Sequence, residues 1–318
     1  MNARNDFDGD GRSDILWRDN DTGALRSWLG QASGGFVINP SVSGQVSTDW
    51  FVASIGDFNG DDRADVLWRN GMGTVVSWLG QDGGGFVHNT GVSGQVPTNW
   101  YVARTGDFNG DGNDDVLWRK DTGEMVSWLG QDSGGFVNNP GVSGQAPANW
   151  FVAGTGDFNG DGNDDLLWRN LDTGALQSWL GQDSGGFVNN PSVSGQLPTN
   201  WFMTGTGDFN GDGNDDLLWR NASSGALVSW LGQDSGGFVN NPGVSGQLPS
   251  NWFVASTGDF NGDDNDDILW RNNDTGAVMS WLGQDGGGFV NNPGVSGHVD
   301  LSWHVQPSGG GGFSWWDY

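Results

Sequence analysis

Short runs of apolar and aromatic residues alternate with polar, glycine-rich segments along the whole chain. One unit of this pattern contains four such runs, at residues 150–153, 166–169 and 175–180 and from Phe187 onward. β-Branched and aromatic residues between turn-forming clusters are typical of strands, and no stretch combines helical periodicity with helix caps. We therefore predict four short β-strands per unit and an all-β fold.

The segments between the runs predict the connections. An acidic loop at 157–165 joins the first strand to the second, and turns at 170–174 and 181–186 follow the second and third strands. The fourth strand is expected to be short and to end soon after Val188. Residues 189–200 would then form a longer connection to the next unit.

The unit occurs six times, at intervals of 50 or 51 residues. Its acidic loops begin at residues 6, 57, 107, 157, 208 and 259. Four short strands in roughly 50 residues are typical of one blade of a β-propeller. The sequence therefore predicts a six-bladed β-propeller of four-stranded blades.

The two ends of the chain predict how the ring closes. Only residues 1–5 precede the first acidic loop, so the first unit lacks its first strand, whereas a lone run at 303–306 follows the last unit in the register of that strand. Pairing of this C-terminal strand with the first blade would hide an open sheet edge. We predict one propeller domain at 1–306 and a glycine-rich, aromatic tail at 307–318. The glycines of the tail are typical of a linker, and its aromatic end either packs on the ring, packs on a second subunit or has no native role.

Each acidic loop carries oxygen ligands at fixed positions. In residues 157–165 (DFNGDGNDD), side-chain oxygens stand at positions 1, 3, 5 and 9, the backbone carbonyl of position 7 adds a fifth ligand, and two glycines allow a tight turn. Calcium prefers such oxygen ligands, so we predict up to six Ca²⁺ ions, one per loop. The predicted ligands are Asp6, Asp8, Asp10, Arg12 and Asp14; Asp57, Asn59, Asp61, Arg63 and Asp65; Asp107, Asn109, Asp111, Asn113 and Asp115; Asp157, Asn159, Asp161, Asn163 and Asp165; Asp208, Asn210, Asp212, Asn214 and Asp216; and Asp259, Asn261, Asp263, Asn265 and Asp267.

The loop is not an EF-hand. An EF-hand places a bidentate glutamate at position 12, whereas position 12 here is tryptophan in every unit and a strand follows it. The aspartate at position 9 must close the site, and we expect a structural ion with an affinity on the order of 10⁻⁴–10⁻³ M rather than a signalling switch. Asp8 replaces asparagine in the first loop, which is expected to bind most tightly. Asp62 and Asp264 stand at position 6, where aspartate tolerates left-handed torsions.

The charge of the chain restricts its partners. The formal net charge is −27, which argues against nucleic acid and anionic membranes. Nineteen of the 39 acidic residues lie at ligand positions of the loops, so the ion-free loops would repel themselves and folding should be linked to ion binding. No apolar run approaches the roughly 18 residues of a membrane span, so no membrane insertion is expected, and no signal peptide follows Met1.

Residues for catalysis are scarce. The chain has no cysteine, three histidines at unrelated positions of the repeat and a single glutamate, Glu124, and it has no Gly-x-Ser-x-Gly or phosphate-binding motif. All other side-chain carboxylates belong to aspartates, and half of these are committed to the predicted metal sites. We therefore expect no enzymatic activity.

The acidic loop followed by Leu-Leu-Trp-Arg, as at 157–169, resembles the FG-GAP/VCBS repeat, the calcium-binding blade of integrin α-chain propellers. The Trp-Leu-Gly-Gln and Gly-Gly-Phe segments are similar to those of secreted proteobacterial versions, and the resemblance extends over residues 1–306. It implies a β-propeller, calcium on the blade loops, at the aspartate and asparagine positions named above, and an extracellular location. Propellers of this family often have seven blades, so the six copies leave the blade number open.

Tryptophan and arginine recur at fixed places. Eighteen of the 20 tryptophans fall at three positions per unit, exemplified by Trp168, Trp179 and Trp201. They either pack between blades or offer an indole face to a sugar, and the best candidates for the second role are Trp100, Trp150, Trp201 and Trp252. An arginine follows the loop tryptophan in all six units, where it is expected to pair with aspartate or to stack on tryptophan.

These features favour a secreted, calcium-binding module without catalytic activity. Carbohydrate recognition at several equivalent grooves between blades is the first hypothesis, since weak sites gain from multivalency. A structural or adhesive module that binds extracellular protein or itself is the second. An accessory domain of a larger secreted enzyme is the third.

Overall fold

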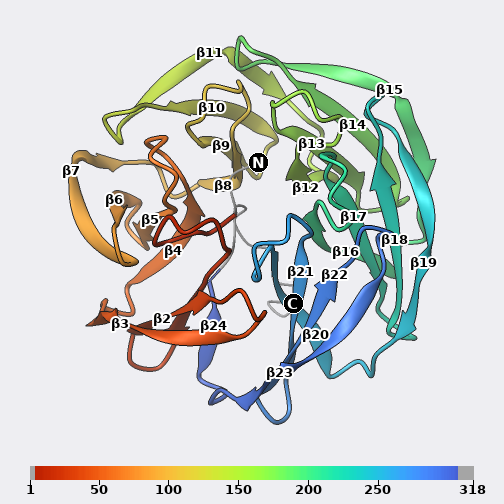
Figure 1. The fold of residues 1–318 in the computed structure, drawn as a ribbon. Coiled ribbons are helices and arrows are strands. Elements are labelled where there is room, and N and C mark those ends of the chain that lie inside the picture. The colour runs from red at the N-terminus through yellow and green to blue at the C-terminus, as the bar shows by residue number, and fades with distance from the viewer. Residues whose placement is uncertain (1–3, 307–318) are drawn as a thin grey trace.

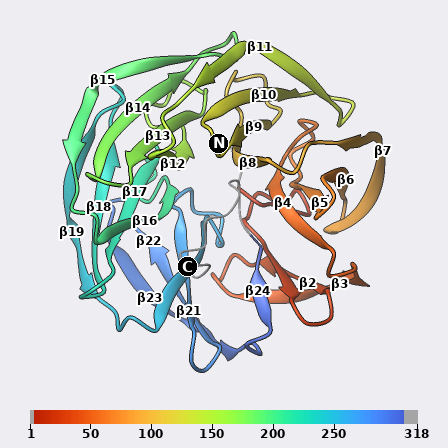
Figure 2. The same cartoon turned by 180° about the vertical axis from the view of Figure 1, so that it is seen from behind.

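The computed structural model describes residues 4–306, and the predicted tail at 307–318 lies outside the described residues. It contains six four-stranded antiparallel sheets arranged in a ring, as Figure 1 and the reverse view in Figure 2 show. The chain passes from blade to blade in sequence order. The six-bladed, all-β propeller predicted from the repeats is confirmed.

Each blade takes four strands. In blades 1 to 3 these are β24 (Trp303–Val305), β1 (Ile15–Asp19), β2 (Ala24–Gly30) and β3 (Phe36–Gln45); β4 (Trp50–Gly56), β5 (Asp65–Asn70), β6 (Thr74–Gln81) and β7 (Gly85–Gln95); and β8 (Trp100–Gly106), β9 (Asp115–Lys120), β10 (Glu124–Gly130) and β11 (Phe136–Gln145). In blades 4 to 6 they are β12 (Trp150–Gly156), β13 (Asp165–Asn170), β14 (Ala175–Gly181) and β15 (Phe187–Gln196); β16 (Trp201–Gly207), β17 (Asp216–Asn221), β18 (Ala226–Gly232) and β19 (Phe238–Gln247); and β20 (Trp252–Gly258), β21 (Asp267–Asn272), β22 (Ala277–Gly283) and β23 (Phe289–His298). No helix within residues 4–306 is long and apolar enough to cross a membrane.

The first blade is assembled from both ends of the chain. Strand β24 pairs antiparallel with β1, with Trp17 opposite Val305. The N-terminal segment continues the same edge of β1, because the backbone N–H of Asp14 donates to the carbonyl of Asn5 at 3.1 Å. The prediction that the C-terminal strand completes the first blade is therefore confirmed.

The fourth strand of each blade is longer than the sequence predicted. Strand β15 runs through Pro191 to Gln196, so most of the expected connection at 189–200 belongs to the sheet. Proline is tolerated because this strand is the edge of its sheet. The pairing register also shifts between Gln177 and Ser178, and such a β-bulge leaves residues of the bulged strand unpaired.

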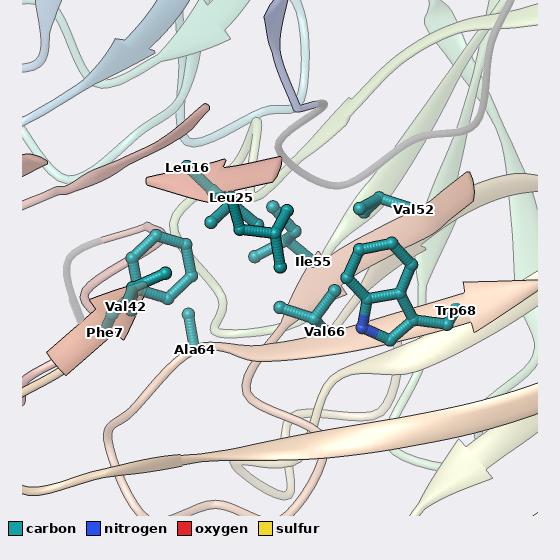
Figure 3. Packing of buried hydrophobic residues seen from close by; sticks show 9 residues of the cluster. All are labelled: Phe7, Leu16, Leu25, Val42, Val52, Ile55, Ala64, Val66 and Trp68. Carbon is teal, nitrogen blue, oxygen red and sulfur yellow. The ribbon is translucent and has the colours of Figure 1, made fainter. Parts of the chain in front are cut away.

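The hydrophobic core lies between the blades and consists of six clusters. Figure 3 shows the cluster between blades 1 and 2, where Leu16 from β1 and Val66 from β5 lie close to Phe7 and Trp68. The largest fully buried side chains repeat in every unit. They are Trp17, Trp68, Trp118, Trp168, Trp219 and Trp270, and Phe7, Phe58, Phe108, Phe158, Phe209 and Phe260.

Contacts between neighbouring blades form closed circles. Each loop phenylalanine meets a phenylalanine of the next blade edge to face, and the last of these pairs, Phe260 with Phe36, closes the circle at 5.1 Å between ring centroids. Such aromatic pairs stabilise by about 0.5–1.5 kcal/mol beyond their area burial. Likewise, the side-chain amide of Asn292 on β23 donates to the carbonyl of Gly34 in blade 1 at 2.6 Å.

The six repeated arginines form another circle. Each guanidinium lies over the loop tryptophan of the next blade, which confirms the predicted stacking, and its amino groups donate to backbone carbonyls, as Arg169 does to Pro198 at 2.9 Å. The six pairs, with the distance from guanidinium carbon to ring centroid, are Arg18–Trp68 (5.5 Å), Arg69–Trp118 (5.4 Å), Arg119–Trp168 (5.3 Å), Arg169–Trp219 (5.3 Å), Arg220–Trp270 (5.7 Å) and Arg271–Trp17 (5.2 Å). Within residues 4–306, none of these six arginines forms an ion pair with an aspartate, which was the alternative expectation.

Candidate metal centres

The acidic loops connect the first and second strands of blades 2 to 6 and precede β1 in blade 1, and they are closed at both ends by their own aspartates. At position 1, Asp157 accepts backbone N–H groups from Asp161 at 3.1 Å and from Gly162 at 2.9 Å. At position 9, Asp165 accepts from Phe158 at 3.2 Å and from Gly181, at the end of β14, at 2.9 Å. The carboxylates thus hold the chain in a tight loop through hydrogen bonds that need no bound ion.

The loop turns so tightly because several residues adopt left-handed torsions. Gly160 and Gly162 have φ values of 68° and 89°, which a residue with a side chain adopts only with strain. Asp62 and Asp264 replace the second glycine in two loops and have φ values of 65° and 67°. Aspartate therefore occupies the left-handed position at these two sites, as the sequence predicted.

The first loop gathers three predicted ligands. Carboxylate oxygens of Asp6, Asp8 and Asp14 all lie within 4.8 Å of one another. The Oδ1 atom of Asp8 is buried and has no hydrogen-bond partner within residues 4–306. Asp10, also predicted as a ligand, forms an ion pair with Arg12.

Other loops also contain buried oxygens without a partner among the described residues. These include Oδ1 of Asn59 and Asn109 at position 3. Amide and carboxylate oxygens are suitable donors to a hard divalent cation, and a buried oxygen without a partner is costly unless a ligand satisfies it. The residues of the first three loops therefore fit a hard cation such as calcium, and the carboxylates of the first loop lie closest together.

Burial disfavours the ionised form of the carboxylates in these loops. It raises the pKa of Asp6 at position 1 to about 6, and neighbouring carboxylates add to the effect while backbone N–H groups oppose it. At position 9 burial has the same dominant effect in every loop and raises the pKa values to about 8. These residues are Asp14, Asp65, Asp115, Asp165, Asp216 and Asp267. A bound cation would offset this penalty and favour the ionised carboxylates.

The residue at position 7 uses its side chain as well as the backbone carbonyl that the sequence predicted as a ligand. Oδ1 of Asn113 is buried without a partner within the described chain. It lies 3.0 Å from the place that a Cβ on Gly60, in the loop of the preceding blade, would take. The side chain at position 7 therefore packs against the neighbouring loop, and the repeated Asn at this position was the available signal.

Position 8 joins successive loops and was not singled out by the sequence analysis. The carboxylate of Asp114 accepts the backbone N–H of Asp57, position 1 of the preceding loop, at 2.8 Å, and Asp215 accepts that of Asp157 at 2.9 Å. The backbone N–H of position 8 donates to the carbonyl of the same residue in all six junctions. These bonds are Ser13 to Asp259 (2.7 Å), Ala64 to Asp6 (2.6 Å), Asp114 to Asp57 (2.6 Å), Asp164 to Asp107 (2.7 Å), Asp215 to Asp157 (2.7 Å) and Asp266 to Asp208 (2.7 Å).

Arg4 supplies a positive charge to these position-8 carboxylates. Its guanidinium forms an ion pair with Asp215 and donates to the hydroxyl of Thr206 at 3.1 Å. Asp215 and Thr206 belong to blade 5, so the N-terminal segment of blade 1 reaches two blades away. Burial raises the pKa of Asp215 to about 6, and the charge of Arg4 limits this rise.

The tryptophans proposed to bind a sugar are half-buried, in contrast to the loop tryptophans. Trp100, Trp150, Trp201 and Trp252 each begin the first strand of a blade. Between blades 2 and 3, a pocket of about 160 Å³ brings Trp100 together with two other tryptophans. Its lining residues are Gln95, Val96, Pro97, Trp100, Trp118, Val126 and Trp128.

Several solved propellers share the overall fold. The Pseudomonas aeruginosa periplasmic gluconolactonase PpgL is 12% identical with a TM-score of 0.54, over 88% of this chain and 82% of that one. A putative 6-phosphogluconolactonase from Bacteroides uniformis is 13% identical with a TM-score of 0.53, over 91% and 82%. The SapL1 lectin in complex with alpha methyl fucoside is 13% identical with a TM-score of 0.50, over 89% and 95%. At these identities the similarity concerns the fold alone.

Sequence comparison identifies the repeat itself. No curated protein matches the chain in sequence. The pattern of the FG-GAP-like repeat, however, matches residues 6–68, 107–168, 157–219 and 208–270, which together make up well over half of the chain. Together with the six blades and their acidic loops, this match places the protein in the FG-GAP-like repeat family.

Proposed function

We propose that this protein is a secreted, calcium-stabilised β-propeller that acts as a non-catalytic binding module for carbohydrates. The FG-GAP-like repeats and the likeness in fold to a periplasmic propeller support an extracellular or periplasmic location. The likeness to a lectin bound to a fucoside supports, by fold alone, a sugar as ligand. The acidic loops support the ion, and a pocket between two blades supports the sugar.

Calcium is supported by the donor set of the loops. Asp6, Asp8 and Asp14 bring three carboxylates together, and burial raises the pKa of Asp14 to about 8. Up to six ions, one per loop, would neutralise charge that the chain itself leaves largely unpaired. The ion would then act as part of the scaffold and not as a reagent.

The pocket between blades 2 and 3 carries the proposal of a carbohydrate ligand. Trp100 and Trp128 are half-buried and line the pocket, whereas Trp118 is fully buried. The indole N–H of Trp118 has no hydrogen-bond partner within residues 4–306. Aromatic walls with a few polar groups are typical of small-ligand sites, and an indole face can stack on the apolar face of a pyranose.

The same register recurs around the ring. Trp150, Trp201 and Trp252 begin the following blades as Trp100 begins blade 3. A ligand with repeated sugar units could therefore engage several junctions at once and gain avidity from weak single sites.

The test begins with a glycan array probed with the calcium-loaded protein. For a glycan that binds, calorimetry should then show that Trp100→Ala loses one site or weakens it roughly tenfold or more. Leu171→Ala is the matched control, because Leu171 is a 49% exposed apolar residue outside the pocket. Absence of any glycan signal from folded, calcium-loaded protein would contradict the carbohydrate proposal.

A protein-binding or self-associating role is favoured by a different observation. The outermost strand of each blade exposes a valine at the same register, to 46–47% of its surface. These residues are Val37, Val87, Val137, Val188, Val239 and Val290. Exposed apolar side chains on edge strands are suited to association. Light scattering over a range of concentrations tests this alternative, and a monomer throughout would count against self-association.

A further inference from the structure

Position 7 divides the six acidic loops into two kinds. It is asparagine in blades 3 to 6 but arginine in blades 1 and 2, as Arg12 and Arg63. The loops at 57–65 (DFNGDDRAD) and 259–267 (DFNGDDNDD) form a natural pair that differs only at positions 7 and 8. The two loop sequences therefore differ at two residues, and the position-7 side chain of the adjoining loop differs as well, with Asn113 against Gly60 and Arg12 against Gly262.

The two side chains at position 7 make analogous contacts. The Nη1 atom of Arg63 lies 3.5 Å from Oδ2 of Asp61 and donates to the Asp61 carbonyl at 3.2 Å. Its Nη2 atom pairs with Asp82, in the turn after β6. In blade 6, the amide of Asn265 lies 3.4 Å from an oxygen of Asp263 and 3.4 Å from one of Asp285. Arginine therefore places a full positive charge where asparagine places a neutral amide.

The charge of the predicted ligand set changes accordingly. In the loop of blade 2, Asp57, Asp61 and Asp65 contribute −3 and Arg63 contributes +1, which leaves −2. The corresponding residues of blade 6 leave −3, because asparagine is neutral. In blade 1 the extra carboxylate of Asp8 compensates for Arg12, so blade 2 has the lowest negative charge of these three loops.

Calcium affinity in oxygen-ligand loops depends on ligand charge and rigidity. A guanidinium in contact with Asp61 both reduces the attraction for a dication and already neutralises part of the loop. We propose that Arg63 is a built-in counter-ion that makes the blade-2 loop the weaker calcium site of the pair and the one that depends less on calcium for its folding. This inference rests on the calcium sites of the proposed function.

Reciprocal substitutions test the proposal. Arg63→Asn should tighten calcium binding at the blade-2 loop roughly 3- to 10-fold, and Asn265→Arg should weaken the blade-6 loop by a similar factor. Competition between the protein and a chromophoric chelator measures both changes. In EGTA, Arg63→Asn should lower the melting temperature, because its loop loses the internal cation, whereas Asn265→Arg should not.

A charge control separates a local effect from a general one. Arg26→Asn removes the same charge from β2, where Arg26 lies 4.4 Å from the ring centroid of Trp303 and not in an acidic loop. If Arg63→Asn and Arg26→Asn change calcium binding equally, or if both reciprocal variants bind as the wild type does, the role of Arg63 is overturned. A wild-type protein that binds no calcium at all would instead overturn the calcium sites themselves.

Discussion

The aromatic and the acidic regions of this propeller are built from the same repeat, but their buried side chains find interaction partners in different ways. In the aromatic region, each buried tryptophan receives the guanidinium of the preceding blade, and each loop phenylalanine meets a ring of the next, so neighbouring blades supply the partners. In the acidic region, burial raises the pKa of position-9 carboxylates such as Asp165 to about 8, and oxygens such as Asp8 Oδ1 have no partner among the described residues. The aromatic side chains therefore find their partners within the ring, whereas the acidic loops keep buried carboxylates and oxygens that the proposed calcium ions would satisfy.

Removal of calcium should have the largest effect, and it should act on the acidic region alone. At 10 to 100 times its dissociation constant, each bound ion stabilises the folded state by about 1.4–2.7 kcal/mol, and up to six sites contribute. Scanning calorimetry in millimolar Ca²⁺ and in excess EGTA measures the difference, and re-addition of Ca²⁺ should restore the melting temperature. An unchanged melting temperature in EGTA would show that the acidic loops are satisfied without an ion.

The pH dependence of stability should reverse between these two conditions. Without calcium, the position-9 carboxylates have a folded-state pKa of about 8, above the ordinary value of 3.8. A raised pKa favours the protonated folded state, so this stabilisation is present below about pH 4 and is lost as pH rises through 8. With calcium, the ion requires ionised ligands, so stability should rise over the same interval. Melting temperatures between pH 5 and 8 in EGTA and in Ca²⁺ measure both slopes, and equal slopes would contradict the prediction.

Much of the aromatic region was predictable because its residues recur at the same positions of every repeat. Eighteen tryptophans at three fixed places indicated packing between blades, and the lone strand at 303–306 indicated how the ring closes. The length of the fourth strand was not predictable from local signals. Pro191 and the polar residues around it are typical of a loop, and only the edge position of β15 and its bulge explain why a strand continues there.

The acidic region was predictable in its spacing but not in its connections. Positions 1, 3, 5 and 9 follow from ligand chemistry alone. The role of position 8 depends on the preceding blade, because the carboxylate of Asp114 accepts the backbone N–H of Asp57 across a junction that no local pattern specifies. The same holds for Arg4, whose partner Asp215 is far away in sequence. Contacts of this kind follow from ring closure and become visible only with the fold.

Truncation of a buried aromatic side chain should lower the stability of the fold strongly, and this loss should not depend on calcium. Phe158 is fully buried and lies 5.2 Å from the ring of Phe238, so Phe158→Ala should lower the free energy of unfolding by about 3–5 kcal/mol. Val188→Ala, at a 47% exposed site on β15, should change it by no more than about 0.5 kcal/mol. Denaturant unfolding in saturating Ca²⁺ measures both, and similar losses in the two variants would contradict the inter-blade role of Phe158.

Removal of Arg4, the cation that the chain itself supplies to the acidic region, should have the smallest effect on stability. Arg4→Met removes the ion pair with Asp215 and the hydrogen bond to Thr206, but the Arg4 side chain is 32% exposed and partly screened by water. We expect a loss of about 1–2 kcal/mol in saturating Ca²⁺, measured by denaturant unfolding at neutral pH. Most of this loss would come from leaving the buried Asp215 unpaired, so Arg4→Met combined with Asp215→Asn should be more stable than the two separate losses would predict. Strictly additive losses would show that Arg4 stabilises the ring through contacts other than the one with Asp215, such as its hydrogen bond to Thr206.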